Sequence, residues 1–251
     1  MEKTALFNYI LGIADNNLIL GQGLGELCGH GPNLETDIAL TNIALDLFGQ
    51  TRSYYQYAAK LSAIHKTEDD VAYLRKEREY KNVLLVEQPN THFGYVIARQ
   101  YLFDVFNYLF VEKLQHSKDE TLSAIAKKAI KEVSYHKRFS GDWVKRLGDG
   151  TEESNQKMQE AIDGLWQYTN ELFEMTEADE IALKAGIGVN LSELKEAYYK
   201  EVSEVLKEAT LTIPENPYFQ KGGKQGIHTE HMGYILADLQ YMQRTYPNMT
   251  W

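Results

Sequence analysis

Apolar residues recur along this chain at the three- to four-residue spacing of amphipathic helices, and no segment shows a convincing two-residue alternation typical of strands. A first helix is predicted from about Ala5 to Cys28. A second is predicted to start near Thr36, where a hydroxyl and an acidic first turn suit a helix start. The segment Gly29 to Pro32 separates them, because glycine permits a left-handed cap and proline cannot continue a helix.

The rest of the pattern predicts further helices joined by short loops. The segment from about His92 to His116 is apolar on most sides, which predicts the most buried helix of the protein. The other helices are predicted at about Glu68 to Arg78, Glu120 to Leu147, Thr151 to Phe173, Leu191 to Ala209 and Thr229 to Arg244. We predict one all-α domain over residues 1–251, with a core bundle at about 5–150 and additional helices and a tail at about 151–251.

Composition narrows the class of protein. With 43% hydrophobic and 25% charged residues, the chain has the balance of an ordered globular protein. The formal net charge of -10 argues against nucleic acid or an anionic membrane as the main partner. No apolar run approaches the roughly 20 residues that cross a bilayer, and Met1 to Thr4 lack the layout of a signal peptide. These features predict a soluble, cytoplasmic protein.

Cys28 is the one cysteine of the chain. A single thiol excludes an internal disulfide framework and a cysteine-based zinc site. Because Cys28 lies near the end of an apolar helix, it is predicted to be a small core residue rather than a nucleophile.

Several predicted helices carry a polar group within an apolar face. Asp46 and Asp104 each lie among large apolar residues, and Glu132 and His136 lie one helical turn apart. Asp15 opens a polar break in the first helix. A buried carboxylate is costly unless it meets a metal, a cation or several hydrogen bonds. One such group on each of several long helices is the layout of a carboxylate di-iron centre.

The ligand set of such a centre is incomplete in this chain. Carboxylate di-iron proteins take a Glu-x-x-His pair from each of two helices, and here no acidic residue is followed by a histidine three positions later. Two irons need about six protein ligands, and this chain offers three or four. The favoured interpretation is therefore a set of polar core residues paired with Arg52, Arg99 or tyrosine hydroxyls. Residual metal binding and an unrecognised catalytic role are the alternatives.

His228 and His231 are spaced as i and i+3, which can chelate zinc from a helix. No further ligand cluster is evident nearby, and the sequence contains no His-Glu-x-x-His. A helix cap at Thr229 with a pair of surface histidines is the favoured interpretation.

The densest cationic stretch of this acidic chain precedes the predicted most buried helix. It contains Arg75, Lys76, Arg78, Glu79, Tyr80, Lys81 and Asn82. One interpretation is a solvated helix end with internal ion pairs. The other is a patch for a phosphorylated ligand, since lysine and arginine bind phosphate oxygens.

Segments spread over nearly the whole chain together resemble one family, the C subunits of 1,2-phenylacetyl-CoA epoxidase. The matching segments are Leu24 to His30, Asn42 to Gln50, Leu84 to Asn90, Ile97 to Tyr101, Ala129 to Glu132, Tyr135 to Ser140 and Gly226 to His231. They occur in the order of the family, so the match is specific although no single motif is. The resemblance is weakest at residues 64–73 and 173–194.

The resemblance implies a ferritin-like four-helix bundle core with additional C-terminal helices. It also implies an assembly in which a catalytic A subunit of the same fold holds the di-iron site and epoxidises the ring of phenylacetyl-CoA. A small B subunit joins it, and a reductase with FAD and an iron-sulfur centre supplies electrons from NADPH. The C subunit holds no cofactor and supports its partner. Asp46, Asp104, Glu132 and His136 are then vestigial di-iron-like positions.

The same resemblance makes the cationic stretch, Arg75 to Asn82, a candidate contact for the phosphates of CoA. The isolated chain is expected to form a homodimer through the face meant for the A subunit. Two other classes stay open: a stand-alone ferritin-like metalloprotein with an atypical ligand set, and a scaffold or storage protein unrelated to oxygenases.

Overall fold

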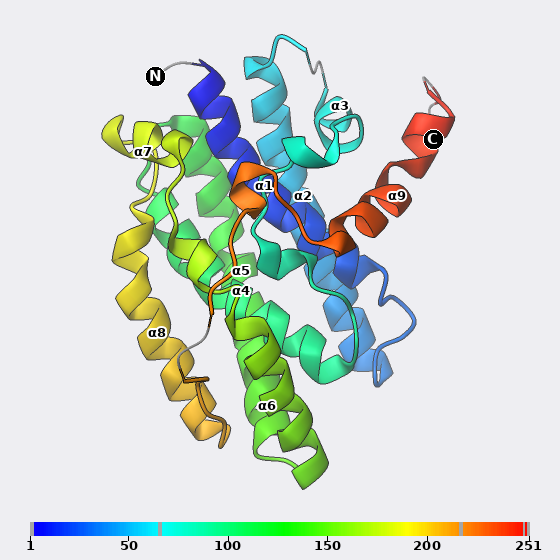
Figure 1. Ribbon diagram of the computed structural model, residues 1–251. Helices are drawn as coiled ribbons and strands as arrows, with labels where there is room; N and C mark the ends of the chain where they lie inside the picture. The colour runs from blue at the N-terminus through cyan, green and yellow to red at the C-terminus, as the bar shows by residue number, and fades with distance from the viewer. Residues whose placement is uncertain (1–2, 65–66, 216–217, 248, 250–251) are drawn as a thin grey trace. The chain divides into compact units, whose positions relative to one another are not determined.

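The computed structural model describes residues 3–64, 67–215, 218–247 and 249 (Figure 1). Within these residues the secondary structure is helical and contains no strand. The all-α, ferritin-like fold class predicted from the sequence is confirmed. The contacts divide the chain into two compact units. Unit 1 comprises Met1–Glu87, Thr176–Ala185 and Gly222–Trp251, and unit 2 comprises Gln88–Met175 and Gly186–Lys221. The single domain over 1–251 stays a prediction.

Unit 1 is built on two long helices that pack side by side, α1 (Lys3–Gly25) and α2 (Leu34–Leu61). The helix α2 starts at the cap Asn33, whose side chain accepts the backbone N–H of Thr36 at 2.9 Å. The smaller elements are α3 (Glu68–Tyr73), η1 (Glu77–Glu79), η2 (Leu84–Glu87), α7 (Glu177–Lys184), η4 (Gly223–Gln225) and α9 (Glu230–Thr245). Of these, η2, α7 and α9 all pack on α1.

Unit 2 is built on α4 (Phe93–Leu114) and α5 (Glu120–Gly148), with α6 (Glu152–Trp166), η3 (Asn170–Phe173) and α8 (Leu191–Glu208) around them. The helix α4 is buried along nearly its whole length, as its apolar sequence predicted. The helix α5 buries one face and exposes the other. This difference follows from sequence, since a helix with apolar residues on most sides must be surrounded by protein.

The structure differs from the predicted helices at several places. The predicted helix from Glu68 to Arg78 ends at Tyr73, because Arg75 turns inward and the backbone at Lys76 is extended. The helix predicted to end at Phe173 ends at Trp166, and the 3-10 turn η3 follows. The helix α7 was not predicted.

The prediction that Cys28 is a core residue is wrong. The helix α1 ends at Gly25, three residues before the predicted end. Cys28 therefore lies in the turn that follows, where its side chain is exposed.

Across the part of the chain that the structure describes, we find no helix that is both long and apolar enough to cross a membrane.

Candidate functional site

The polar break in α1 is the centre of a buried ion pair in unit 1. Asp15 and Arg75 are 0% and 1% exposed, and the guanidinium donates to both carboxylate oxygens, at 2.6 and 2.9 Å. The hydroxyl of Tyr55 on α2 donates to the same carboxylate at 2.5 Å, and the backbone N–H of Lys81 donates at 2.7 Å. This Asp15 cluster satisfies the carboxylate entirely with protein donors, as a buried charge requires.

Arg75 is held on its other sides as well. Its Nε donates to the carbonyl of Val71 at 2.6 Å, and its Nη1 donates to that of Glu79 at 2.9 Å. The ring of Tyr80 lies 4.0 Å from the guanidinium carbon, a cation–π distance. Burial alone lowers the pKa of Arg75, but the charge of Asp15 outweighs it and the pKa lies above its ordinary value. The pair is therefore a fixed part of the fold.

A second buried cluster in unit 1 centres on Glu87, the last residue of η2. Its Oε1 contacts Nδ1 of His228 at 2.6 Å and accepts from the amide of Asn82 at 3.0 Å. Its Oε2 accepts from the backbone N–H and the hydroxyl of Thr229, at 2.9 and 2.7 Å. The side chains of Glu87 and His228 are both 0% exposed. This Glu87 cluster joins the start of α9 to a segment more than a hundred residues earlier.

The Glu87 cluster corrects the interpretation of the two histidines. His228 was predicted to be a surface residue, but its ring is buried and its Nε2 lies 3.2 Å from the carbonyl oxygen of Tyr80. Both ring nitrogens are engaged by protein atoms, so the arrangement does not leave His228 and His231 as a chelating pair. Thr229 is the N-cap residue of α9, as predicted, but its hydroxyl donates to Glu87 and makes no capping bond to the helix.

Unit 2 holds a buried carboxylate of a different kind, that of Asp104 on α4. Its oxygens accept from the amide of Gln100 at 2.7 Å and from the hydroxyl of Ser140 on α5 at 2.8 Å. Burial raises the pKa of Asp104 to about 7, although the charge of His136 and these two hydrogen bonds oppose the rise. His136 is fully buried on α5, one turn before Ser140. We call these four residues the Asp104 cluster.

The four residues predicted to be vestigial di-iron-like positions are distributed between the two units. Asp104, Glu132 and His136 belong to unit 2, and Asp46 belongs to unit 1. Asp104 and His136 are fully buried, whereas Asp46 and Glu132 are half-buried and each has an interaction with the protein. Within the described residues, no group of three or more His, Cys, Asp or Glu is arranged to hold a metal ion. The donor set does not fit a di-iron centre, which needs more ligands than this.

Of the predicted partners, a tyrosine hydroxyl does bond to a buried acid, since Tyr55 donates to Asp15, whereas the contacts described for the two arginines are with other groups. Arg52 forms an exposed ion pair with Glu68 at 3.3 Å. The guanidinium of Arg99 donates to the carbonyl of Gln88 and, at 2.8 Å, to the side chain of Asn90. The cation that meets Asp15 is Arg75, which the sequence analysis had considered as a candidate phosphate contact. Glu87 was missed, although an acidic residue directly after Leu84, Leu85 and Val86 was a signal for it.

The structure divides the candidate phosphate-binding residues into two groups. Arg75, Tyr80 and Asn82 are buried, and the first two are engaged in the Asp15 cluster. Lys76, Arg78 and Glu79 are exposed, and Lys81 is half-buried. A phosphate from outside can reach only the second group without opening the core.

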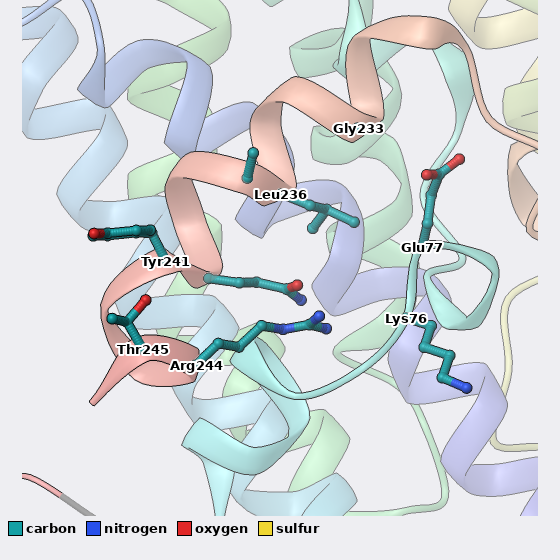
Figure 2. Close-up of a pocket in the computed structure, with 9 residues that line it drawn as sticks. Lys76, Glu77, Gly233, Leu236, Tyr241, Arg244 and Thr245 are labelled. Atoms are coloured by element: carbon teal, nitrogen blue, oxygen red, sulfur yellow. The ribbon is translucent and has the colours of Figure 1, made fainter. Parts of the chain in front are cut away.

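A groove of about 420 Å³ lies in unit 1 between α9 and this segment (Figure 2). Its walls come from one edge of α9 and from Lys76 and Glu77 opposite. The α9 residues that line it are Gly233, Leu236, Ala237, Gln240, Tyr241, Arg244 and Thr245. In Figure 2 the carboxylate of Glu77 lies near Gly233, while the guanidinium of Arg244 lies toward the other end.

The fold and the sites together define an all-α, ferritin-like bundle whose described buried carboxylates are bonded to protein groups. The chain belongs to the family described as "Phenylacetic acid catabolic protein", whose match covers residues 1–251. It is 49% identical over 243 residues to the C subunit of 1,2-phenylacetyl-CoA epoxidase of Escherichia coli (strain K12), covering 97% of this chain and 98% of that relative. These comparisons confirm the family resemblance found in the sequence.

Proposed function

We propose that this chain is a non-catalytic structural subunit of a multicomponent di-iron oxygenase that epoxidises the ring of phenylacetyl-CoA in phenylacetate catabolism. Its role is to stabilise the catalytic A subunit, within an assembly that also contains a small B subunit. The relative from Escherichia coli, aligned over nearly its whole length, supports the assignment. The iron of the reaction then resides in the A subunit, and NADPH, FAD and the iron-sulfur centre belong to the reductase. A cytoplasmic location stays a prediction.

The observation that carries the proposal is how the buried carboxylates are satisfied. Asp15 accepts from Arg75, Tyr55 and Lys81, so a cation and neutral donors of the protein satisfy this buried carboxylate, as metal ions satisfy the carboxylates of di-iron proteins. Asp104 accepts from Gln100 and Ser140. A bundle arranged in this way keeps the helical fold of its catalytic relatives without binding dioxygen-activating metal.

The outer face of α2 is the surface that we assign to the A subunit. Leu34, Ile38 and Leu45 are 70%, 50% and 60% exposed on this helix. They lie at positions i, i+4 and i+11, so they form a stripe along one face. Apolar stripes of this kind on a helix are typical of protein–protein interfaces. A homodimer of the isolated chain would use the same stripe, and sedimentation at micromolar concentration tests it.

Co-expression with the A subunit tests the proposal directly. We expect the pair to co-purify, and the A subunit to melt at a higher temperature with this chain than alone. Leu45→Glu places a charge in the stripe, and we expect it to weaken the association at least about tenfold, which corresponds to about 1.4 kcal/mol. Lys60→Glu changes an exposed residue in the last turn of the same helix and serves as the control. An A subunit equally stable without this chain would contradict the structural role.

Contact with the CoA ester is a separate part of the proposal. Of the candidate residues, Lys76, Arg78 and Lys81 have the exposure that a phosphate contact needs. The triple change to alanine is expected to raise the KM of the assembled enzyme for phenylacetyl-CoA severalfold and to leave kcat unchanged. An unchanged KM would remove this part of the proposal and leave the structural role intact.

A stand-alone metalloprotein is the second candidate function. The observation in its favour is the buried pair Asp104 and His136, whose charges interact in unit 2. Elemental analysis of the chain purified from iron-supplemented cells distinguishes the two candidates. We expect an iron content near zero, whereas about two irons per chain would make this protein itself a candidate oxygen-activating enzyme.

A further inference from the structure

The helix α9 has little apolar anchorage in unit 1. Its buried residues are Met232, Leu236 and Gln240, and one of these three is polar. The groove of about 420 Å³ runs along the same edge, so packing there is incomplete (Figure 2). Two tyrosines of α9 are also largely exposed, Tyr234 at 76% and Tyr241, which lines the groove, at 58%. An element with few buried apolar contacts opens locally at low cost.

Polar contacts to the segment between α3 and η2 hold α9 in place instead. Gln240 donates to the carbonyl of Arg75 at 2.9 Å and to the hydroxyl of Tyr80 at 2.8 Å. Arg244 donates to the same carbonyl of Arg75 at 2.9 Å. At the other end of the helix, His228 and Thr229 bond to Glu87. These bonds join the segment 222–245 to the backbone at residues 75–87.

The backbone before α9 also fits closely on this segment. Gly226 has φ +81, and a Cβ there would lie 2.2 Å from the carbonyl oxygen of Arg78. A Cβ built on Gly223 would likewise collide with the carbonyl oxygen of Asn82. Only glycine permits approaches this close, so the two chain segments are shaped to lie against each other.

His228 is the group in this contact whose bonding depends on its protonation state. Its Nε2 faces the carbonyl oxygen of Tyr80, which can only accept, and its Nδ1 faces the carboxylate of Glu87. Both nitrogens must therefore carry hydrogen for both bonds to form, and only the imidazolium ion has two N–H donors. A neutral ring can keep one of the bonds and loses the other.

We propose that residues 222–245 form a pH-sensitive clasp over residues 75–87, with the protonated ring of His228 as the catch. The charged and titratable groups that act on the ring are Glu87 and Glu77, together with the backbone carbonyl of Tyr80. When His228 loses its proton, the clasp opens more often and exposes the backbone that carries Lys76, Arg78 and Lys81. The inference does not depend on the proposed function.

The direction of the titration agrees with this geometry. Burial lowers the pKa of His228, but the hydrogen bond and charge of Glu87 outweigh it and the pKa lies above 6.5. Burial raises the pKa of Tyr80 to about 12, so its phenol stays neutral in the same range. A group whose pKa is higher in the folded than in the unfolded protein stabilises the fold fully at any pH below its unfolded-state pKa. This stabilisation is lost as the pH rises through the folded-state pKa. The clasp is therefore closed at pH 6 and loosens as the solution becomes basic.

Hydrogen exchange followed by mass spectrometry between pH 6 and 9 tests the clasp, with each amide compared as a protection factor. We expect protection in residues 75–87 and 230–245 to fall about tenfold or more over this range. Protection in α5 of unit 2 should change much less and serves as the internal reference. In His228→Gln the side chain is neutral at every pH, so both segments should be weakly protected already at pH 6, with no further loss.

His231→Gln is the matched control, because His231 lies three residues away on α9 and is not among the groups described as contacting Glu87. It should behave as the unmodified protein. Protection that does not depend on pH in the unmodified protein would overturn the proposal. So would a pH dependence that persists in His228→Gln or disappears in His231→Gln. If His228→Gln also loses protection in α5, the histidine holds the whole fold together and a local clasp is excluded.

Discussion

Asp15 in unit 1 and Asp104 in unit 2 are both buried carboxylates on apolar helices, and the protein accommodates them differently. Asp15 forms a bidentate ion pair with the guanidinium of Arg75, and the hydroxyl of Tyr55 and a backbone N–H also donate to the carboxylate. Asp104 accepts from the neutral side chains of Gln100 and Ser140. A cation compensates the buried charge directly, whereas neutral donors compensate it in part and burial raises the pKa of Asp104 to about 7.

The comparison shows that a polar residue on an apolar helix face has more than one structural solution. In the case of Asp15, the carboxylate stays charged and links α1 to a segment distant in the sequence. In the case of Asp104, the carboxylate changes its protonation state near neutral pH, and the fold must accommodate both the charged and the neutral form. A sequence pattern of acids among apolar residues therefore indicates that the acids are buried. The groups that hydrogen-bond to each carboxylate then determine whether it stays charged or takes up a proton.

The largest effect is expected from removing the cation in unit 1. Arg75→Met leaves the charge of Asp15 buried without its ion-pair partner, and we expect a loss of about 3–5 kcal/mol in the free energy of unfolding. Chemical denaturation measures it. Arg78→Met, at an exposed position three residues later, should change stability by less than about 0.5 kcal/mol. Similar losses in the two variants would show that the ion pair contributes little.

A second effect, which depends on pH, is expected from Asp104→Asn. An unfolded aspartate loses its proton near pH 3.8, whereas in the folded protein the proton is kept to about pH 7. Between these values the folded state binds more protons, so the free energy of unfolding falls as the pH rises, by at most about 1.4 kcal/mol per pH unit. The asparagine variant should lack this slope.

Denaturation curves of the unmodified protein and of Asp104→Asn at pH 4, 5.5, 7 and 8 measure how the free energy of unfolding changes with pH. Asp15→Asn, which removes the carboxylate of the other unit, is the comparison variant and should be less stable at all these pH values. If Asp104→Asn keeps the full slope of the unmodified protein, Asp104 is not the group responsible for it.

The smallest effect is expected from Ser140→Ala. It removes one of the two hydrogen bonds to Asp104, and we expect a loss of about 1 kcal/mol together with a further rise in the pKa of Asp104. The pH dependence of unfolding reports both quantities. Ser203→Ala, which removes a half-buried hydroxyl bonded to the carbonyl of Tyr199 within α8, provides the control for a hydroxyl outside the cluster. A pH profile identical to that of the unmodified protein would remove Ser140 from the Asp104 cluster.

Much of the helical architecture could be predicted from the sequence, because apolar periodicity and breaker residues are local signals. The ends of α4, α5 and α8 agree with the predicted ranges to within about two residues. The errors lie where tertiary contacts override local preference. Arg75 turns away from a helical path to reach Asp15, so α3 is shorter than predicted. Thr229 was correctly predicted as a cap position, but its hydroxyl donates to the buried carboxylate of Glu87 instead of accepting a helix N–H.

The sequence by itself determined the helical class, the family and the presence of acids within apolar faces. It also shows that no acidic residue is followed at helical spacing by the histidine of a di-iron ligand pair. The tertiary structure alone decided which donor meets each acid. Arg75 lies 60 residues from Asp15 in the chain, and His228 lies 141 residues from Glu87. Periodicity describes which face of a helix is buried, and it contains no information about which distant side chain will arrive there. That choice depends on how loops bring segments together, and only the folded chain shows it.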